Sequence, residues 1–255
     1  MISYISYFDL LGFKKFILNN DSEYIQRRIG HILRDIEMSM GQGEFTRTSQ
    51  GVIANISNFI LNCLNISDTI IFWTNNDSLV SFNELLKVSF YFNYKLTCYH
   101  FPVRGAILFD EIDLIAGFQE TQGGGSYNVN SIFGKGLVKA HLKAESLNFA
   151  SCIIDNSVSN KLIEYGDVHD IYGDYAMKYQ VPYKNGVIID PEYVLKFYIN
   201  KSITEQAFRN RASGIQRAFE NDNKGMDERS EILLNNTIDF LGALLEYNQS
   251  GFIIR

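Results

Sequence analysis

The sequence predicts an α+β fold, and two kinds of pattern predict it. Runs of β-branched and aromatic residues, bounded by polar or glycine-containing turns, indicate strands. Apolar residues at three- and four-residue steps between those runs indicate helices. The predicted order is strand, helix, two strands, helix and strand, which is the βαββαβ core of a ferredoxin-like fold with an antiparallel sheet. Because many functions use this arrangement, the function has to be argued from the site.

The first half of this core contains a strand, a helix and two further strands. Residues 2–8 mix β-branched and aromatic residues with Ser and predict the first strand. Apolar residues recur with helical spacing over 25–40. We expect a polar loop over 44–49, and then two strands within 53–73 that are joined by a tight turn over 65–68.

The second half begins with a helix and continues into further strands. Ser81 and Glu84 have the spacing of a capping box, which predicts a helix start there. The later elements are predicted, in order, as strand 103–109, a loop or hairpin tip over 119–130, helix 135–147, strand 152–154 and strand 193–199.

The last part of the chain is helical and strongly charged. Ser202 and Glu205 repeat the capping-box spacing, and residues 221–225 separate two helices. We therefore divide the chain into a core, 1–200, and a C-terminal helical extension, 201–255. The extension is expected to brace a dimer or to cover the sheet, and docking of a regulator is the alternative.

Composition excludes several classes of partner. The chain has 255 residues, a formal net charge of −6 and a pI near 5.3, so it lacks the positive footprint of proteins that bind duplex nucleic acid or anionic lipid. No apolar run reaches the ~18 residues of a membrane-spanning helix. Three scattered cysteines, Cys63, Cys98 and Cys152, indicate reduced thiols. We expect a cytoplasmic protein with no nucleic-acid or membrane partner.

The sharpest local feature is the segment Phe8–Phe13, with the sequence Phe-Asp-Leu-Leu-Gly-Phe. It places Asp9 at the end of a predicted strand, just before Gly12 and a turn into a helix. A carboxylate supplies the hard oxygen ligands that Mg²⁺ or Mn²⁺ prefers, and exposed N–H groups at a helix start can receive phosphate oxygens. The alternative is that Asp9 only caps the helix.

A second carboxylate, Asp68, lies in the predicted turn between two apolar strands. In a βαββαβ core the turn between the middle strands lies beside the end of the first strand, so Asp68 is expected to meet Asp9. Two carboxylates repel each other unless a cation lies between them, and two-metal phosphoryl chemistry uses such a pair. A plain hairpin-turn role for Asp68 is the alternative.

Arg104 interrupts the otherwise apolar strand 103–109. A buried cation needs a partner, because an unpaired one is expensive. The planar guanidinium is suited to a phosphate or to a nucleobase carbonyl. Structural pairing with Asp110 or Glu111 is the alternative.

Four segments together carry a resemblance to a known family. They are Phe8–Phe13, Ser67–Ile70 (Ser-Asp-Thr-Ile), Arg104–Ile107 (Arg-Gly-Ala-Ile) and Phe133–Ala140 (Phe-Gly-Lys-Gly-Leu-Val-Lys-Ala). In this order they resemble the class III nucleotide cyclases, and more closely the bacterial pyrimidine cyclases of antiphage defence. The resemblance extends from Tyr4 to Asn156 and continues more weakly through 181–186.

The resemblance implies a reaction, cofactors and site residues. In that family the ribose 3′-hydroxyl attacks the α-phosphate of a nucleoside triphosphate, which gives a 3′,5′-cyclic nucleotide and pyrophosphate. The resemblance implies that Asp9, Leu10 and Asp68 bind two divalent metal ions, Mn²⁺ or Mg²⁺. It also implies a head-to-tail homodimer whose metal-binding and base-binding residues come from different subunits. The implied substrate contacts of the glycine turn are Leu10, Leu11, Gly12 and Phe13.

Departures from the family's pattern point to a pyrimidine substrate. Purine-specific cyclases carry a Lys or Glu where this chain has Leu64, and an Asp or Cys where it has Ser131. A purine edge without these partners loses hydrogen bonds, each omission costing on the order of 1–3 kcal/mol. The Asn and Arg that stabilise the transition state in those enzymes correspond to Val138 and Leu142, and a Gly that often follows the Arg-Gly-Ala-Ile strand is Asp110.

Arg104 is the candidate for the compensating cation and the base reader, and Lys139 and Lys143 are further candidates. The sequence thus predicts a pyrimidine nucleotide cyclase of antiviral defence, with UTP as the first choice of substrate and CTP as the second. Asp9, Asp68 and Arg104 are the predicted catalytic residues. Leu64, Arg104, Ser131 and Lys139 join the glycine turn as predicted substrate-binding residues.

Two alternatives from other classes stay open. The first is a catalytically inactive cyclase-like module that binds a nucleotide or a partner, since the family's residues are absent at Val138 and Leu142. The second, a palm-type nucleotidyltransferase, is disfavoured by the acidic charge balance. For the cyclase, an effector that responds to the cyclic product is the implied downstream partner.

Overall fold

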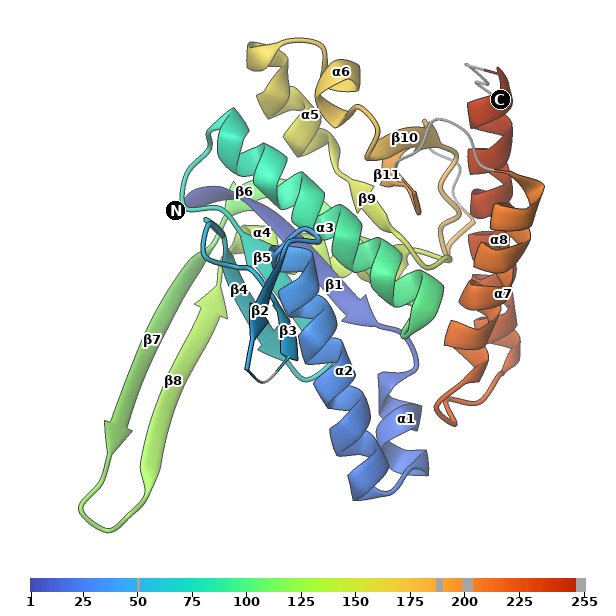
Figure 1. Cartoon of the computed structure of the whole chain (residues 1–255). Helices are drawn as coiled ribbons and strands as arrows, with labels where there is room; N and C mark the ends of the chain where they lie inside the picture. The colour runs from blue at the N-terminus through green and yellow to red at the C-terminus, as the bar shows by residue number, and fades with distance from the viewer. Residues whose placement is uncertain (50, 187–189, 199–203, 251–255) are drawn as a thin grey trace.

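A seven-stranded sheet with the order β10-β11-β9-β6-β1-β5-β4 forms the centre of the molecule. The computed structural model describes residues 1–49, 51–186, 190–198 and 204–250. The strands are β1 (Ile2–Leu10), β4 (Asn62–Ile66), β5 (Thr69–Trp73), β6 (Val103–Glu111), β9 (Cys152–Ile154), β10 (Ala176–Tyr179) and β11 (Glu192–Leu195). Figure 1 shows β1 running through the middle of this sheet.

The predicted ferredoxin-like core is confirmed by the strand order itself. β1 pairs with β5 and with β6, and β4 pairs with β5, all antiparallel. The four strands therefore stand as β6-β1-β5-β4, which is the order that a βαββαβ core requires. Among the strand pairs that the structure describes, only β6–β9 is parallel.

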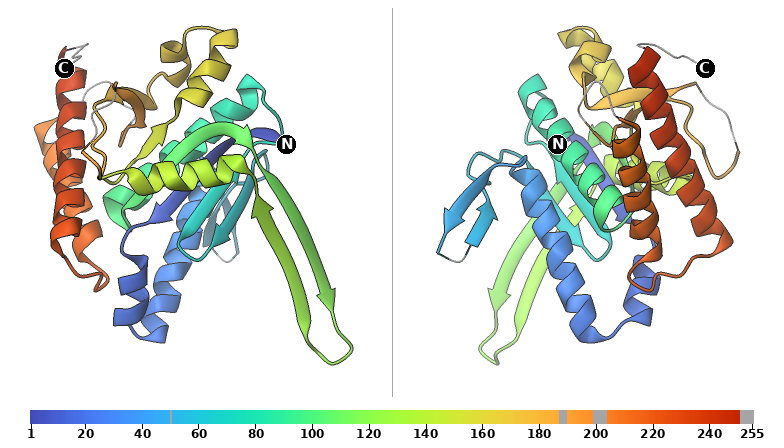
Figure 2. Two further views of the ribbon diagram at one scale, coloured as in Figure 1. Left: turned by 180° about the vertical axis from the view of Figure 1, so that it is seen from behind. Right: turned by 45° about the vertical axis from the view of Figure 1, so that its right-hand side comes forward.

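Helices cover both faces of the sheet because β1 is apolar on both faces. Tyr4 and Phe8 belong to one buried cluster, with side chains of α2 (Ser22–Met40) and α3 (Leu79–Tyr99). Ile5 and Tyr7 alternate with them and belong to the other cluster, with α4 (Lys135–Ser146). Helix α3 crosses the sheet on the near side in Figure 1, and α4 crosses it on the side seen from behind in Figure 2.

The C-terminal helices share the second core. They are α7 (Glu205–Glu220) and α8 (Glu228–Ser250), which pack alongside each other in Figures 1 and 2. Ile215 and Phe219 of α7, and Leu233 and Phe240 of α8, belong to the same buried cluster as Ile5. Helix α7 packs mainly against α3 and α8, so the expectation that the extension covers the sheet or braces a dimer stays a prediction.

Several smaller elements complete the fold. The hairpin of β7 (Asp113–Glu120) and β8 (Ser126–Phe133) projects from the body of the molecule, with residues 121–125 at its tip (Figures 1 and 2). The short helices are α1 (Phe13–Asn19), α5 (Asn156–Leu162) and α6 (Val168–Tyr172), and one 3₁₀ turn covers Ile163–Tyr165.

Two predictions in the region before β4 were wrong. The expected polar loop over 44–49 contains the strand β2 (Phe45–Thr48), which pairs with β3 (Gly51–Ala54) in a separate hairpin. The expected strand pair within 53–73 therefore starts only at Asn62. Phe45, Thr46 and Thr48 suit a strand, and cross-strand pairing with β3 outweighs the polarity that suggested a loop.

The start of α3 also differs from the prediction. The N-cap is Ser78, whose Oγ accepts a hydrogen bond from the Ser81 N–H at 3.2 Å. Ser81 is already helical, and its own hydroxyl donates to Asn76 at 2.9 Å. The cap of α7 is Thr204, and the predicted cap Ser202 lies outside the described residues. The predicted strand 193–199 was too long, because β11 ends at Leu195 and residues 196–198 are not in a strand.

Within the described residues, no helix is long and apolar enough to cross a membrane.

Candidate functional site

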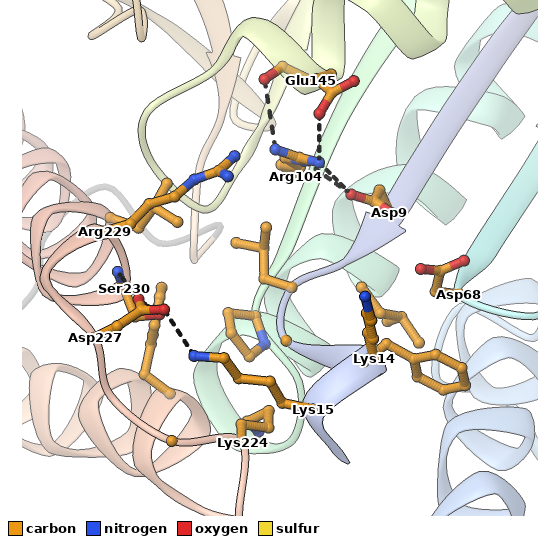
Figure 3. Close-up of a pocket in the computed structure, with 18 residues that line it drawn as sticks. Asp9, Lys14, Lys15, Asp68, Arg104, Glu145, Lys224, Asp227, Arg229 and Ser230 are labelled. Atoms are coloured by element: carbon orange, nitrogen blue, oxygen red, sulfur yellow. Dashed lines mark hydrogen bonds and ion pairs between the residues drawn. The ribbon is translucent and has the colours of Figure 1, made fainter. Parts of the chain in front are cut away.

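The end of β1 meets the β4–β5 turn, which brings Asp9 and Asp68 to the same edge of the sheet. Asp9 pairs with Thr69 in the antiparallel register, so the next residue of the turn, Asp68, lies beside it. The Leu10 N–H donates to the Asp68 carbonyl at 2.9 Å. The turn itself is two residues long, and Ser67 adopts a φ of +57° within it. Figure 3 shows both carboxylates on one side of a cavity.

The cavity has a volume of about 450 Å³ and collects charge of both signs. Five cationic and four anionic side chains line it, so it carries a small positive excess in a chain whose net charge is −6. The charged residues are Asp9, Lys14, Lys15, Asp68, Arg104, Glu145, Lys224, Asp227 and Arg229. Such a mixture is suited to an anionic ligand that is bound together with cations.

Arg104 lies next to Asp9 rather than next to Asp110 or Glu111. Its Nε donates to Asp9 Oδ2 at 2.8 Å, and its Nη2 lies 2.7 Å from the same oxygen. Its Nη1 donates to the Glu145 carbonyl at 3.4 Å. The cross-strand register explains the contact, because Arg104 on β6 is the direct partner of Asp9 on β1.

Burial and charge act in opposite directions on Asp9. Burial raises the pKa of the Asp9 carboxyl above its ordinary value, Arg104 opposes that shift, and the nearby Asp68 charge adds to it. The influence of Asp68 on the pKa of Asp9 agrees with the geometry of the sheet edge. The two carboxylates therefore interact although 58 residues separate them in the sequence.

Four residues of the glycine turn after β1 were predicted to contact the substrate, and two of them have a backbone N–H group available for it. The N–H groups of Leu10 and Leu11 donate to the Asp68 and Pro102 carbonyls, both at 2.9 Å. Within the described part of the chain, the N–H groups of Gly12 and Phe13 have no hydrogen-bond partner. Gly12 has a φ of +82°, which a residue with a Cβ rarely adopts, so the turn depends on glycine at this position.

Three predicted substrate-binding residues do not line this cavity in a single chain. Leu64 lies on β4 opposite Ile71, and its side chain packs against the second core. Ser131 lies on the projecting strand β8 and is exposed. Lys139 on α4 donates to Asp110 at 2.5 Å, and this hydrogen bond raises the pKa of Lys139.

The resemblance implies two metal ions, which the side chains around Asp9 and Asp68 would have to bind. No group of three or more His, Cys, Asp and Glu side chains that could hold a metal ion occurs in the part of the chain that the structure describes. Of the two carboxylate oxygens of Asp9, Arg104 contacts only Oδ2. Within the described residues, the carboxylate of Asp68 has no hydrogen bond or ion pair. Magnesium is commonly bound by one or two carboxylates together with substrate phosphates and water. The residues fit ions that are shared with a substrate, and they do not form a closed metal cage.

The sequence analysis did not identify four of the cationic side chains that line the cavity. Lys14 and Lys15 directly follow the glycine turn, so their position in the sequence was a usable signal. Lys224 and Arg229 come from the link between α7 and α8 and from the start of α8. No local pattern connects those two residues to a turn about 200 positions earlier, and only the packing of α8 brings them there.

Comparisons with known proteins give fold-level likenesses only. No protein-family model matches the chain, and no curated protein matches it. Among solved structures, the guanylate cyclase domain of RhGC from Catenaria anguillulae in complex with GTP matches with a TM-score of 0.45 and 8% identity, covering 76% of this chain and 96% of that chain. The catalytic core of a rhodopsin-guanylyl cyclase with converted specificity, in complex with ATPalphaS, matches with 0.45 and 8%, covering 76% and 95%.

The adenylyl cyclase CyaB from P. aeruginosa matches with a TM-score of 0.38 and 10% identity, covering 76% of this chain and 94% of that chain. We draw no conclusion about activity from likenesses at these TM-scores. The fold assignment rests on the strand order and pairing described above.

Proposed function

We propose that this chain is a nucleotide cyclase that forms a 3′,5′-cyclic nucleotide and pyrophosphate from a nucleoside triphosphate. The observation that carries the proposal is the meeting of Asp9 and Asp68 at the edge of a cavity with a surplus of cations. The four sequence segments that resemble the class III cyclases are the second support. Three of them, Phe8–Phe13, Ser67–Ile70 and Arg104–Ile107, contribute to the wall of this cavity.

The residues have distinct roles in this proposal. Asp9 and Asp68, with Leu10 beside them, hold the divalent ions, which when bound lower the pKa of the 3′-hydroxyl and neutralise the triphosphate. The free N–H groups of Gly12 and Phe13 donate to phosphate oxygens. Arg104 is fixed by Asp9 and Glu145, so it presents a preorganised positive charge to the charge that develops on the α-phosphate.

The substrate that we propose is a pyrimidine triphosphate, UTP first and CTP second. Leu64 stands where purine-specific cyclases carry a Lys or Glu, and it is an apolar side chain that packs against the core. It offers no hydrogen bond to a purine edge. Ser131 is the only polar group of the two base-reading positions. A role as second-messenger synthase in antiviral defence, with an effector that responds to the product, belongs to the same proposal.

We also propose that the active form is a homodimer. Leu64 and Ser131 lie away from the Asp9 cavity in one chain, as expected if base-binding and metal-binding residues come from different subunits. An apolar groove of about 430 Å³ lies between the sheet and α4. Its lining residues are Tyr7, Ile66, Thr69, Ile71, Ile132, Leu137, Val138 and His141. Val138 and Ile66 of this lining are 59% and 48% exposed, so this surface is suited to a second copy of the chain.

The test of the activity uses the full chain with Mn²⁺ or Mg²⁺ and each of the four nucleoside triphosphates. Chromatography of the products should show a cyclic pyrimidine nucleotide and pyrophosphate, and EDTA should abolish both. Sedimentation at several concentrations should show a dimer. If no triphosphate yields a cyclic product with either metal, the enzymatic proposal fails.

A nucleotide-binding module without activity is the second candidate, and one observation favours it. Arg104 already neutralises one carboxylate oxygen of Asp9 at 2.7–2.8 Å, which weakens this group as a metal ligand. The two candidates differ in their response to Asp9→Asn. A binding module should keep its nucleotide affinity in this variant, whereas the cyclase should lose its turnover.

A further inference from the structure

The C-terminal helices form one wall of the cavity. Lys224, Asp227 and Arg229 line it from the α7–α8 link and the start of α8, opposite the sheet edge that carries Asp9 and Asp68. Figure 3 shows these two sides with the cavity between them. The extension therefore belongs to the site as well as to the core.

The α7–α8 link is fixed to α2 by hydrogen bonds. Asp222 of the link accepts from the Tyr24 hydroxyl at 2.7 Å and from Arg28 Nη2 at 2.8 Å. Its backbone carbonyl accepts from Asn20 at 2.8 Å. The Asp222 side chain is nearly buried, so these charge-assisted bonds are well shielded from water.

The link is also packed onto the glycine turn. The stem of Lys224 covers Gly12 so closely that a Cβ on Gly12 would lie 3.0 Å from Lys224 Cδ. The Lys224 ammonium lies 4.0 Å from the centroid of the Phe101 ring and 3.5 Å from Asp222, and its side chain is 3% exposed. Lys224 is thus an anchor beneath the turn. On the open side, Lys15 of α1 donates to Asp227 at 2.7 Å.

Of the two cations that the extension brings to the cavity, Lys224 is buried as an anchor, and Arg229 has no partner within the described residues. Within the described residues its guanidinium makes no hydrogen bond or ion pair, although it lines the cavity. In Figure 3 it extends from α8 toward the side where Arg104 and Glu145 lie. Its charge acts on the surroundings: burial lowers the pKa of Lys184, Arg104 and Arg229 add to that lowering, and Glu145 and Asp9 oppose it. The anions on this side, Asp9 and Glu145, are both paired with Arg104, so the charge of Arg229 stays available to a ligand.

We infer that the wall supplied by α8 binds the polyphosphate of the substrate, with Arg229 as a direct contact to its phosphate oxygens. A guanidinium donates two parallel hydrogen bonds to a phosphate, and it keeps its charge at every physiological pH. The inference rests on the proposed function for the identity of the substrate. It adds that the C-terminal extension is part of the binding site of its own chain.

The experiment measures the affinity of the full-length chain for inorganic tripolyphosphate with Mg²⁺ by calorimetry. The variants are Arg229→Ala and Arg229→Lys, and the control is Arg209→Ala. Arg209 lies on α7, is exposed, and within the described residues pairs only with Glu205, at 3.2 Å. We expect Arg229→Ala to weaken binding about tenfold, Arg229→Lys to recover part of that loss, and the control to stay within twofold of the unchanged chain.

Activity measurements on the same variants separate this inference from the proposed function. Arg229→Ala should raise KM for the triphosphate more than it lowers kcat. If the chain forms cyclic product while Arg229→Ala changes neither KM nor tripolyphosphate affinity, the inference is wrong and the proposed function stands. If tripolyphosphate binds in an Arg229-dependent way but no cyclic product forms, the site is real and the proposed function is wrong. Absence of tripolyphosphate binding by the unchanged chain overturns the inference.

Discussion

Two cation-bearing regions of the molecule differ in how their cations are paired. On α4, Lys139 pairs with Asp110 at 2.5 Å and Lys143 with Glu192 at 2.7 Å. At the Asp9 cavity, Arg104 and Lys15 are paired with Asp9 and Asp227, but Lys14 and Arg229 have no hydrogen bond or ion pair within the described residues. Cations that are already neutralised within the fold contribute to its stability, whereas cations without a partner attract an external anion. The sequence alone assigned substrate contact to Lys139 and did not single out Lys14 or Arg229.

The largest expected effect is on cyclase turnover, and it distinguishes two carboxylates of the cavity, Asp9 and Asp68, from Asp110, the partner of Lys139. Asp9→Asn and Asp68→Asn should each lower cyclase turnover by about 10³-fold, because both carboxylates hold ions that act on the reacting groups. The matched control is Asp110→Asn, the same substitution on β6 at the partner of Lys139, which should change turnover less than about threefold. Product formation in saturating triphosphate and Mn²⁺ is the measurement. Equal losses in all three variants would contradict the distinction.

The next effect concerns stability in the α4 region. Glu192 is 6% exposed, pairs with Lys143 and accepts a hydrogen bond from the Tyr183 hydroxyl. Glu192→Ala leaves both partners without their acceptor and should lower the free energy of unfolding by about 3 kcal/mol. Arg209→Ala breaks an exposed pair with side chains 71% and 79% exposed, and should cost less than about 1 kcal/mol. Urea denaturation of the two variants tests the contrast.

Asp35 is a buried carboxylate that, unlike Glu192, has no charged partner in the described part of the chain. Asp35 is 2% exposed, its Oδ2 has no hydrogen bond within the described residues, and burial raises its pKa to about 6. His100 lies 3.4 Å away, but burial lowers its pKa to about 4, so it is neutral when Asp35 ionises. Arg34, Lys95 and Arg28 act more weakly in favour of the Asp35 charge.

This arrangement predicts that Asp35→Asn increases the free energy of unfolding by an amount that depends on pH. A raised folded-state pKa means that ionisation destabilises the fold: the penalty is absent below the unfolded value of 3.8 and complete above about 6. The variant should match the unchanged chain in stability near pH 3.5 and exceed it by about 3 kcal/mol at pH 7. Unfolding at a series of pH values measures the difference. A constant difference across that range would contradict the assignment.

The smallest effect compares two exposed lysines directly. Lys14→Ala should weaken the binding of tripolyphosphate about threefold, since one partner-free cation at the cavity is lost. Lys139→Ala should change it less than about 1.5-fold, because Asp110 already neutralises that lysine. Calorimetry on the full chain resolves both values. A larger loss of tripolyphosphate affinity in Lys139→Ala would indicate that this lysine contacts the substrate, from the other subunit of a dimer.

The sequence by itself determined the main elements of the core and the positions of its two carboxylates. The alternation of strand and helix patterns identified the βαββαβ order, because hydrophobic periodicity is a local property of the chain. The turn over 65–68 was predictable for the same reason, so Asp68 could be placed at the end of a hairpin. Its meeting with Asp9 followed from the topology of that fold. The hairpin β2–β3 escaped prediction, since its strands are exposed and carry little periodic signal.

Only the tertiary structure decided which charges meet. Arg104 has Asp9 as its partner and not Asp110, because pairing across the sheet is set by the register of β1 with β6. Arg229 reaches the cavity because burial of apolar side chains seats α8 beside the sheet. Neither contact follows from spacing along the chain, since both depend on packing between segments that local patterns do not relate.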